Sequence, residues 1–399
     1  MFKVVTPIDP DCFEKLLKNH PNKQLVSSFC DGLRLGFWPF ANTGNPDSPI
    51  GIITHSSGLP NLDDKSVTFL KAQHDLEMSL GRYSESFRVD LLPGMVVQPI
   101  FTVPKKGLTK LRLVNDHSAG VNLLNSLIPT EGRFVILDNL SDLGANIRAK
   151  MCEHPGSKPV YLWKSDARQA YRHIPMHPCW QICQATLIDH SYHVDQCAVF
   201  GNHASGHLWC LFFGLLCWVG IHEVGINGLL HYMDNAFSAS FNDRLTKYAP
   251  YDRWMPHNQA HFLSLLDEVG LPHEDKKQVY GRKLEIIGLL VDTEKLSISM
   301  SSEAKLKLVG TIRDFVLNTP DNKCQQSLCA WLRILGYANW ALNAFPILKP
   351  ALNSSYDKVT GKTILSQAVY INKDVQNDLL WFADSMSKLN GVQLFDAED

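Results

Sequence analysis

Two aspartates stand where a metal-dependent transfer of a nucleotidyl group could use them. Asp166 follows the apolar run 160–163, which predicts a central strand, and Asp234 lies in a tight turn between two strand-like segments, 228–232 and 236–241. Such a transfer neutralises the charge of a triphosphate with two magnesium ions, about 3.5–4 Å apart, and magnesium prefers carboxylate oxygens. Because a strand end and a tight turn are both stiff, the two side chains can point into one cleft. Either aspartate alone would be an ordinary turn residue.

The elements around this pair predict a mixed α/β body. Residues 61–90 have a helical pattern, and short β-rich segments begin at Leu91. A helix is expected at 257–269 and a strand at 284–291. Residues 1–60 contain clusters of Gly, Pro and Asn, which predict an irregular lead-in.

The C-terminal part of the chain is predicted to be helical from residue 301. Ser301 can cap the first helix, and its apolar side chains share one face, formed by Leu308, Ile312, Phe315 and Val316. Further helices are expected at 331–343 and 374–386. A globular body followed by a smaller helical part is therefore the predicted organisation.

The composition is that of a globular protein. The 399 residues are 45% hydrophobic and 20% charged, and the formal net charge is −2. A nucleic-acid-binding protein of this charge needs a local basic groove, because Lys and Arg neutralise the phosphates. The longest apolar run, 208–221, is shorter than the about 20 residues that cross a bilayer. We therefore expect a buried core helix there and no membrane partner.

The ten cysteines are scattered, which argues against a disulfide framework. No signal peptide is evident at Met1, and we expect an intracellular protein, cytoplasmic or nuclear. Two pairs, Cys152 with His154 and His177 with Cys179, have spacings that do not complete a set of four zinc ligands. Core or surface histidines are the expectation for these positions.

Five segments resemble motifs A to E of reverse transcriptases, in the same order along the chain. They are residues 163–178, 200–206, 232–235, 270–277 and 287–289. Residues 103–105 and 110–116 resemble the fingers of the same family. A four-residue box alone would be noise, so the resemblance depends on the ordered set of motifs.

The resemblance implies an α+β, right-hand polymerase fold with fingers, a palm built on an antiparallel sheet, and a helical thumb and connection. Its implied parts are the lead-in 1–60, fingers 61–158, palm 159–300 and thumb with connection 301–399. The flanks, 32–40 and 335–352, resemble reverse transcriptases of fungal retroelements, especially the DIRS-like, tyrosine-recombinase group. Such elements continue into an RNase H domain, and no complete RNase H segment is expected in this chain.

The resemblance also implies the metal and sugar contacts. Asp166, Asp234 and the backbone carbonyl of Ala167 would hold two Mg²⁺ or Mn²⁺ ions. Tyr171 stands five residues after Asp166, where the family has an aromatic side chain that blocks a ribose 2′-hydroxyl. The implied activity is RNA-directed DNA polymerisation with an RNA template, a DNA primer and deoxynucleoside triphosphates.

Lys105 and Arg112 stand on either side of a turn and would bind phosphate oxygens, with Arg able to bind two at once. Gly201 lies in the motif B loop. Gln169 and Asn202 would contact the nucleotide or, as an open alternative, form structural hydrogen bonds. The supporting positions that the motifs imply are Tyr232, Met233, Asn235, Lys276, Lys277 and Gly288. Lys276 or Lys277 could donate a proton to pyrophosphate, although paired lysines usually face solvent.

Asn235 departs from the family pattern, which has a second Asp at this place in motif C. Asn keeps the size and an acceptor oxygen but removes one negative charge. We therefore carry two functions from the sequence. The first is an active reverse transcriptase, and the alternative is a weakened or domesticated relative that binds nucleic acid or a partner without polymerising. The oligomeric state is not indicated by the sequence.

Overall fold

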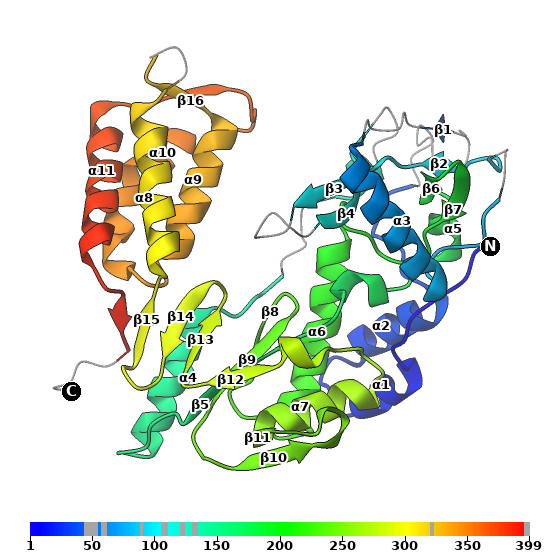
Figure 1. The fold of residues 1–399 in the computed structure, drawn as a ribbon, viewed down its shortest axis with the longest axis horizontal. Helices are drawn as coiled ribbons and strands as arrows, with labels where there is room; N and C mark the ends of the chain where they lie inside the picture. Colours follow the sequence, from blue (N-terminus) through cyan, green and yellow to red (C-terminus); the bar gives the residue numbers. More distant parts are fainter. Residues whose placement is uncertain are drawn as a thin grey trace. The chain divides into compact units, whose positions relative to one another are not determined.

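The computed structural model describes residues 1–43, 55–56, 62–87, 91–104, 111–119, 124–129, 135–319 and 323–394. The chain divides into two compact units, and each is made of three stretches of sequence. The first unit comprises Met1–Leu137, Ser165–Ala236 and Asn258–Gln278. The second comprises Asp138–Lys164, Phe237–His257 and Val279–Asp399. Figure 1 traces the elements of both units along the chain.

The first unit is built mainly from helices with short strands between them. Its helices are α1 (Pro10–Leu16), α2 (Lys23–Leu35), α3 (Asp64–Ser79), η1 (Leu124–Leu127), η2 (Ala170–His173), α5 (Pro178–Gln181), α6 (Ser205–His222), α7 (His257–Glu268) and η4 (Asp275–Lys277). Its strands are β1 (His55–Ser56), β2 (Val96–Val97), β3 (Ile100–Pro104), β4 (Leu111–Asn115), β6 (Ala185–Ile188), β7 (Ser191–Val194) and β8 (Leu230–Tyr232). Strands β1, β2, β6 and β7 form one sheet in that order, and β3 pairs antiparallel with β4.

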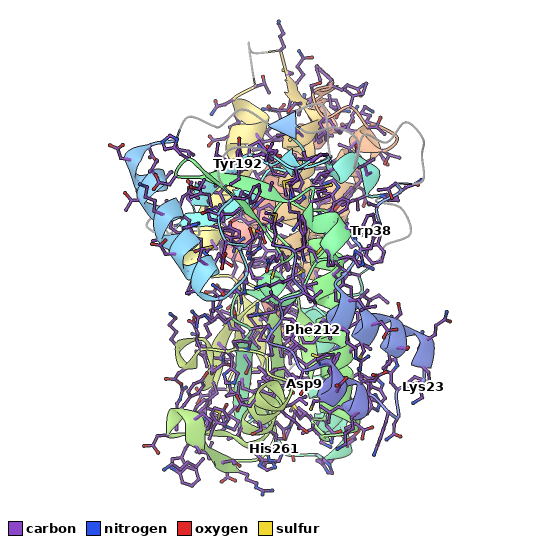
Figure 2. The ribbon with its side chains drawn as sticks, turned by 90° about the vertical axis from the view of Figure 1, so that its right-hand side faces the viewer. Asp9, Lys23, Trp38, Tyr192, Phe212 and His261 are labelled. Atoms are coloured by element: carbon purple, nitrogen blue, oxygen red, sulfur yellow. The ribbon has the colours of Figure 1, made fainter. Side chains whose placement is uncertain are left out.

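Helix α6 is the centre of the first unit's core. It is apolar on all sides, and 61% of its residues are buried inside the protein. Phe212 packs on Phe13 of α1 with ring centroids 5.2 Å apart, and Phe213 packs on Phe262 of α7 at 6.4 Å. Figure 2 labels Phe212 in this interior and Lys23 at the outer face of α2. Among the described residues α6 is the one helix long and apolar enough to cross a membrane, and its burial agrees with the predicted core helix.

The expected irregular lead-in is wrong for residues 10–35, which form α1 and α2. Asp9 caps α1 through its side chain, and Asn22 caps α2. In α2 the buried residues recur at helical spacing and are Val26, Phe29, Cys30 and Leu33. The two helices exist because this apolar face packs on α6, where the rings of Phe29 and Phe212 lie 6.2 Å apart. That tertiary contact outweighs the local turn signals.

A four-stranded sheet in the order β12-β5-β9-β8 carries the two candidate aspartates. Its strands are β8 and β5 (Tyr161–Asp166), β9 (Asn235–Ser240) and β12 (Val279–Gly281). Asp166 is the last residue of β5, and Asp234 lies in the turn between β8 and β9. The predicted strand end and strand–turn–strand arrangement are therefore confirmed. The division between the two units passes through β5 and β9.

The second unit combines small antiparallel sheets with a group of helices. Its helices are α4 (Leu140–Glu153), η3 (Ala249–Tyr251), α8 (Ser302–Leu317), α9 (Leu328–Ala341), η6 (Pro346–Leu352), α10 (Asn353–Val359) and α11 (Lys373–Lys388). Its further strands are β10 (Leu245–Tyr248), β11 (Arg253–Pro256), β13 (Lys283–Ile286), β14 (Leu289–Asp292), β15 (Ser297–Ser299), β16 (Gln325–Ser327), β17 (Ala368–Tyr370) and β18 (Val392–Gln393). Figure 1 shows α8, α9, α10 and α11 gathered together in this unit.

The C-terminal helices form as predicted. The shared apolar face of α8 is buried, and Phe315 meets Trp331 of α9 edge-to-face with ring centroids 5.2 Å apart. Arg313 and Asp384 join α8 to α11 with an N–O distance of 2.7 Å. Helix α8 ends at Leu317, and Asn318 is its C-terminal cap.

The single strand expected at 284–291 is instead a hairpin of β13 and β14. Ile286 pairs with Leu289, so Ile287 and Gly288 form the turn, with φ of +50° and +78°. Trp340 of α9 donates its indole N–H to the Ile287 carbonyl at 2.9 Å. A continuous apolar run hid the turn, because only Gly288 marks the positive φ that a two-residue hairpin loop needs.

We expect Phe212→Ala to lower the free energy of unfolding by about 3–5 kcal/mol, because it removes a fully buried ring and leaves a cavity. Leu35→Ala is the matched control in the same unit, since Leu35 is 63% exposed, and its cost should stay within about 0.5 kcal/mol. Urea unfolding of both variants measures the difference. Equal costs would contradict the central place of α6 in this core.

Candidate functional site

A backbone hydrogen bond holds the two aspartate-bearing segments together. The amide of Ala167, which directly follows Asp166, donates to the carbonyl of Asp234 at 3.0 Å. Met233 adopts a left-handed conformation with φ of +55°, and its carbonyl accepts the indole N–H of Trp209 at 3.1 Å. Such a φ is uncommon for a residue other than glycine, so the tight turn depends on these fixed contacts.

Lys277 contacts the segment that carries Asp166. Its Nζ lies 2.5 Å from Asp166 Oδ1 and 3.4 Å from the carbonyl oxygen of Ala167. Both side chains are partly exposed, at 33% for Lys277 and 25% for Asp166. The ammonium group therefore contacts two of the three oxygen groups that the motif resemblance assigns to metal ions.

Asp234 lies in a more shielded place than Asp166. Burial raises the pKa of the Asp234 carboxyl, and the neighbouring charge of Asp166 raises it further, while Lys277 and Arg112 oppose both effects. Asn235 donates its side-chain N–H to Asp234 Oδ1 at 3.1 Å. Two negative charges thus lie close enough to influence each other, which favours binding of a cation between them.

The oxygen donors fit a hard divalent cation better than a soft one. They are two carboxylates and one backbone carbonyl, all of them oxygen ligands of the kind that magnesium takes. Among the described residues, no group of three or more His, Cys, Asp or Glu side chains is arranged to hold a metal ion. A metal bound here would therefore need ligands beyond the protein, as magnesium does when it keeps waters and phosphate oxygens.

A cleft of about 380 Å³ opens beside Asp234. This is within the usual range of about 300–1,000 Å³ for small-molecule sites. Four of the side chains that line it are cationic and at least partly exposed: Arg112, Arg168, Lys276 and Lys277. With Arg172 the lining holds five cationic side chains against three carboxylates, Glu77, Asp234 and Glu274, so the candidate site is locally basic.

Tyr171 and Arg112 meet across Phe200. The rings of Tyr171 and Phe200 lie 4.8 Å apart, and the Arg112 guanidinium stacks over Phe200 at 4.6 Å from the ring centroid. Burial raises the pKa of the Tyr171 hydroxyl to about 12, with Cys210 and Asp234 adding to the rise, so the phenol stays protonated. Lys105, predicted as the partner of Arg112, lies outside the described residues.

Gln169 lines the cleft and adopts a left-handed conformation with φ of +56°. Its Oε1 accepts from Arg82 Nη1 at 2.7 Å. Arg82 in turn donates to His173 Nδ1 at 3.1 Å. Because arginine can only donate, the Gln169 oxygen must face Arg82, and its amide N–H groups are left for the cleft.

A buried ionic network, two of whose members line the cleft, was not predicted from the sequence. Arg172 lies between Asp195 and Glu77, at 2.8 Å and 2.9 Å, and Arg82 lies 3.6 Å from Glu77. Burial opposes the charge of Glu77, but Arg172 and Arg82 outweigh it and lower the pKa of that carboxyl. An arginine directly after Tyr171 was the local signal, because a buried arginine needs carboxylate partners. Those partners come from α3 and from just after β7, which no spacing rule connects.

Several predicted residues have structural reasons for their identity. Asn202 is 7% exposed, donates to His117 Nδ1 at 3.1 Å and accepts from the Ala204 amide at 2.8 Å. Gly201 has φ of +116°, and a Cβ there would lie 1.9 Å from the Asn115 carbonyl oxygen. Of the alternatives weighed for Asn202, its observed contacts are the structural hydrogen bonds.

The remaining predicted positions lie in different elements. Met233 and Asn235 flank Asp234 in the turn, and Tyr232 is 36% exposed at the end of β8. Lys276 is 77% exposed and pairs with Glu274. Gly288 belongs to the β13–β14 turn of the second unit.

Comparison with known proteins identifies the fold. No protein-family model matches the chain, and no curated protein matches it. Solved structures of a foamy viral protease-reverse transcriptase do match. The dRH form in complex with double-stranded DNA gives a TM-score of 0.59 at 17% identity, covering 100% of this chain and 63% of that one. A complex with an RNA/DNA hybrid gives 0.55 at 16% identity, covering 98% and 48%, and a further complex with double-stranded DNA gives 0.56 at 16%, covering 100% and 75%.

The chain spans less than two thirds of the length of the first two of these structures. At such low identity the likeness establishes the fold and leaves activity open. The predicted fold class is confirmed: this chain has a right-hand polymerase fold, similar to that of the foamy viral structures.

Two buried histidines, His117 and His173, make the stability of the folded protein depend on pH. Burial lowers the pKa of His117 to about 3, with His203 adding to the effect, and burial with Arg82 lowers that of His173 to about 3. Between pH 6.5 and 3 the unfolded chain binds protons that these folded histidines exclude. Their contribution to stability is therefore present above pH 6.5 and is lost as the pH falls.

We expect the free energy of unfolding of His117→Gln to fall less than that of the wild type between pH 6.5 and 4.5. The slopes of the free energy of unfolding against pH should differ by up to about 1.4 kcal/mol per pH unit. Urea unfolding followed by tryptophan fluorescence at several pH values measures this. His190→Asn changes an exposed histidine and should keep the wild-type slope. Identical slopes for His117→Gln and the wild type would refute the buried, neutral state.

Proposed function

We propose that this chain is an RNA-directed DNA polymerase that transfers nucleotidyl groups with the help of two metal ions. One observation carries the proposal: the hydrogen bond from the Ala167 amide to the Asp234 carbonyl brings Asp166 and Asp234 together at a cationic cleft. The right-hand polymerase fold supports it, because the same fold in the foamy viral structures belongs to proteins named as reverse transcriptases. The finer proposal is an origin in a retroelement related to the fungal DIRS-like group, supported by the flank resemblance alone.

In this proposal Asp166, Asp234 and the Ala167 carbonyl hold two Mg²⁺ or Mn²⁺ ions. Bound divalent ions would supply charge neutralisation on the triphosphate and a clamp on the attacking and leaving oxygens. The side chains around them do the positioning. Arg112 and Lys277, which line the cleft, would stabilise the negative charge of the phosphates. Tyr171, whose ring packs against Phe200 of the cleft lining, would disfavour a ribose.

The proposed partners are an RNA template, a DNA primer and deoxynucleoside triphosphates. The foamy viral structures contain double-stranded DNA or an RNA/DNA hybrid, which supports nucleic acid as the partner class. We assign residues 61–158 to fingers, 159–300 to a palm and 301–399 to a thumb and connection, as the motif order suggests.

A second function is favoured by the contact of Asn235 with Asp234. The amide N–H occupies one of the two carboxylate oxygens of Asp234 at 3.1 Å, and the second negative charge of the family pattern is missing. A protein of this kind would bind template and primer without extending them. The two functions differ in whether product forms.

Asp166→Ala should reduce primer extension on an RNA template by roughly 10³-fold or more, because it removes a metal ligand that acts together with Asp234. Asp189→Asn is the control, since Asp189 is an exposed carboxylate of the same unit. Extension is measured with magnesium and with manganese, after thermal unfolding has verified that each variant is folded. Extension that survives Asp166→Ala would refute the assignment. A wild type that binds template–primer but forms no product would establish the second function.

Asn235→Asp should raise the extension rate, by about 10- to 100-fold if Asn235 acts as an outer partner of a metal-binding carboxylate. The substitution removes the amide that bonds to Asp234 and restores the missing charge. A titration with magnesium should also reach half-maximal rate at a lower concentration. Equal rates for the two proteins would show that this charge is dispensable.

A further inference from the structure

Two cationic side chains share one carboxylate in the lining of the cleft. Arg168 Nε lies 3.1 Å from Glu274 Oε1, and Lys276 Nζ lies 2.8 Å from Glu274 Oε2. All three line the cleft that contains Asp234. Glu274 thus pairs, through one oxygen each, with two cations that line the same cleft as Asp234.

The backbone, rather than the ion pairs, places these side chains. Ala167 forms an isolated bridge with His273, and the Arg168 amide donates to the Pro272 carbonyl at 3.2 Å. The Lys277 amide donates to the Glu274 carbonyl at 3.0 Å. Arg168 would therefore stay at the cleft if its contact with Glu274 were broken.

The contacts with Glu274 are of a kind that a stronger anion displaces. The side chains of Arg168 and Lys276 are 43% and 77% exposed, so water and salt screen both pairs. The hydrogen bond from Lys276 lowers the pKa of the Glu274 carboxyl, and Arg168 adds to this, so Glu274 stays ionised at neutral pH. A polyphosphate carries several charges and can accept two bonds from one guanidinium, whereas Glu274 offers Arg168 a single oxygen.

We propose that Arg168 and Lys276 bind the polyphosphate of a nucleoside triphosphate, or the pyrophosphate it releases, and that Glu274 competes with it for both cations. The inference rests on the proposed function and adds a specific pair of ligands and a built-in competitor to it. Glu274 lowers the affinity for the anion and so favours its release. Arg168 stands in the motif A segment as a residue that the sequence analysis left without a role.

Calorimetric titration with inorganic pyrophosphate, and separately with deoxythymidine triphosphate, tests this at fixed magnesium without template or primer. Glu274→Gln should tighten binding roughly three- to tenfold by freeing both cations, and Arg168→Gln should weaken it by a similar factor. Asp267→Asn is the matched control. It removes a carboxylate of the same segment that pairs with His273 and does not line the cleft, so the affinity should not change.

A double-mutant cycle separates competition from simple repulsion of the anion. In a background of Arg168→Gln with Lys276→Gln, the added Glu274→Gln should change the affinity by less than about twofold, because no captured cation remains to be freed. The same tightening in both backgrounds would mean that Glu274 only repels anions, and would overturn the inference. If the wild type extends primers but the effect of Glu274→Gln on affinity is the same in both backgrounds, this inference alone would be overturned. No extension, with the predicted cycle, would overturn the polymerase proposal and leave the anion site standing.

Discussion

Two carboxylates held side by side, with one of them shielded from water, require positive charge nearby. Asp166 and Asp234 are brought together by a backbone hydrogen bond, so neither can move away to relieve the repulsion. The raised pKa of Asp234 reflects both its burial and its neighbour. Lys277 supplies part of the compensation at 2.5 Å from Asp166, and the proposed divalent cations would supply the rest.

Charge around the cleft is divided into a buried part and an exposed part that behave differently. Arg172 is fully committed to Asp195 and Glu77 inside the protein, where breaking such a pair would leave an uncompensated charge. This part is scaffolding, and through Arg82 it sets the orientation of Gln169. Arg168, Lys276 and Glu274 are exposed to water, and their pairs are weak enough to exchange with a ligand. The buried ion pairs of Arg172 can therefore stay fixed while the exposed pairs of Glu274 exchange with a ligand.

Two residues of the site have a strained backbone. Met233 and Gln169 both adopt positive φ without being glycine, one in the turn of Asp234 and one at the cleft wall. Each is held by a side chain from a distant segment: Trp209 donates to the Met233 carbonyl, and Arg82 donates to Gln169. Strained conformations of this kind persist where the surrounding structure over-determines them. Gly201 meets a similar demand through its absent Cβ, since the Asn115 carbonyl lies where a side chain would begin.

The sequence by itself determined the fold class, the strand end at Asp166, the turn at Asp234 and the helical C-terminal part, because each depends on local periodicity, capping or an ordered set of motifs. It did not determine α1 and α2, whose stability comes from packing on α6, or the hairpin at Ile287, which interrupts a continuous apolar run. Only the tertiary structure decided the partners of charged groups. The carboxylates of Arg172 and Arg168 come from segments between 23 and 106 residues away, and no spacing rule relates residues that meet only when the chain has folded.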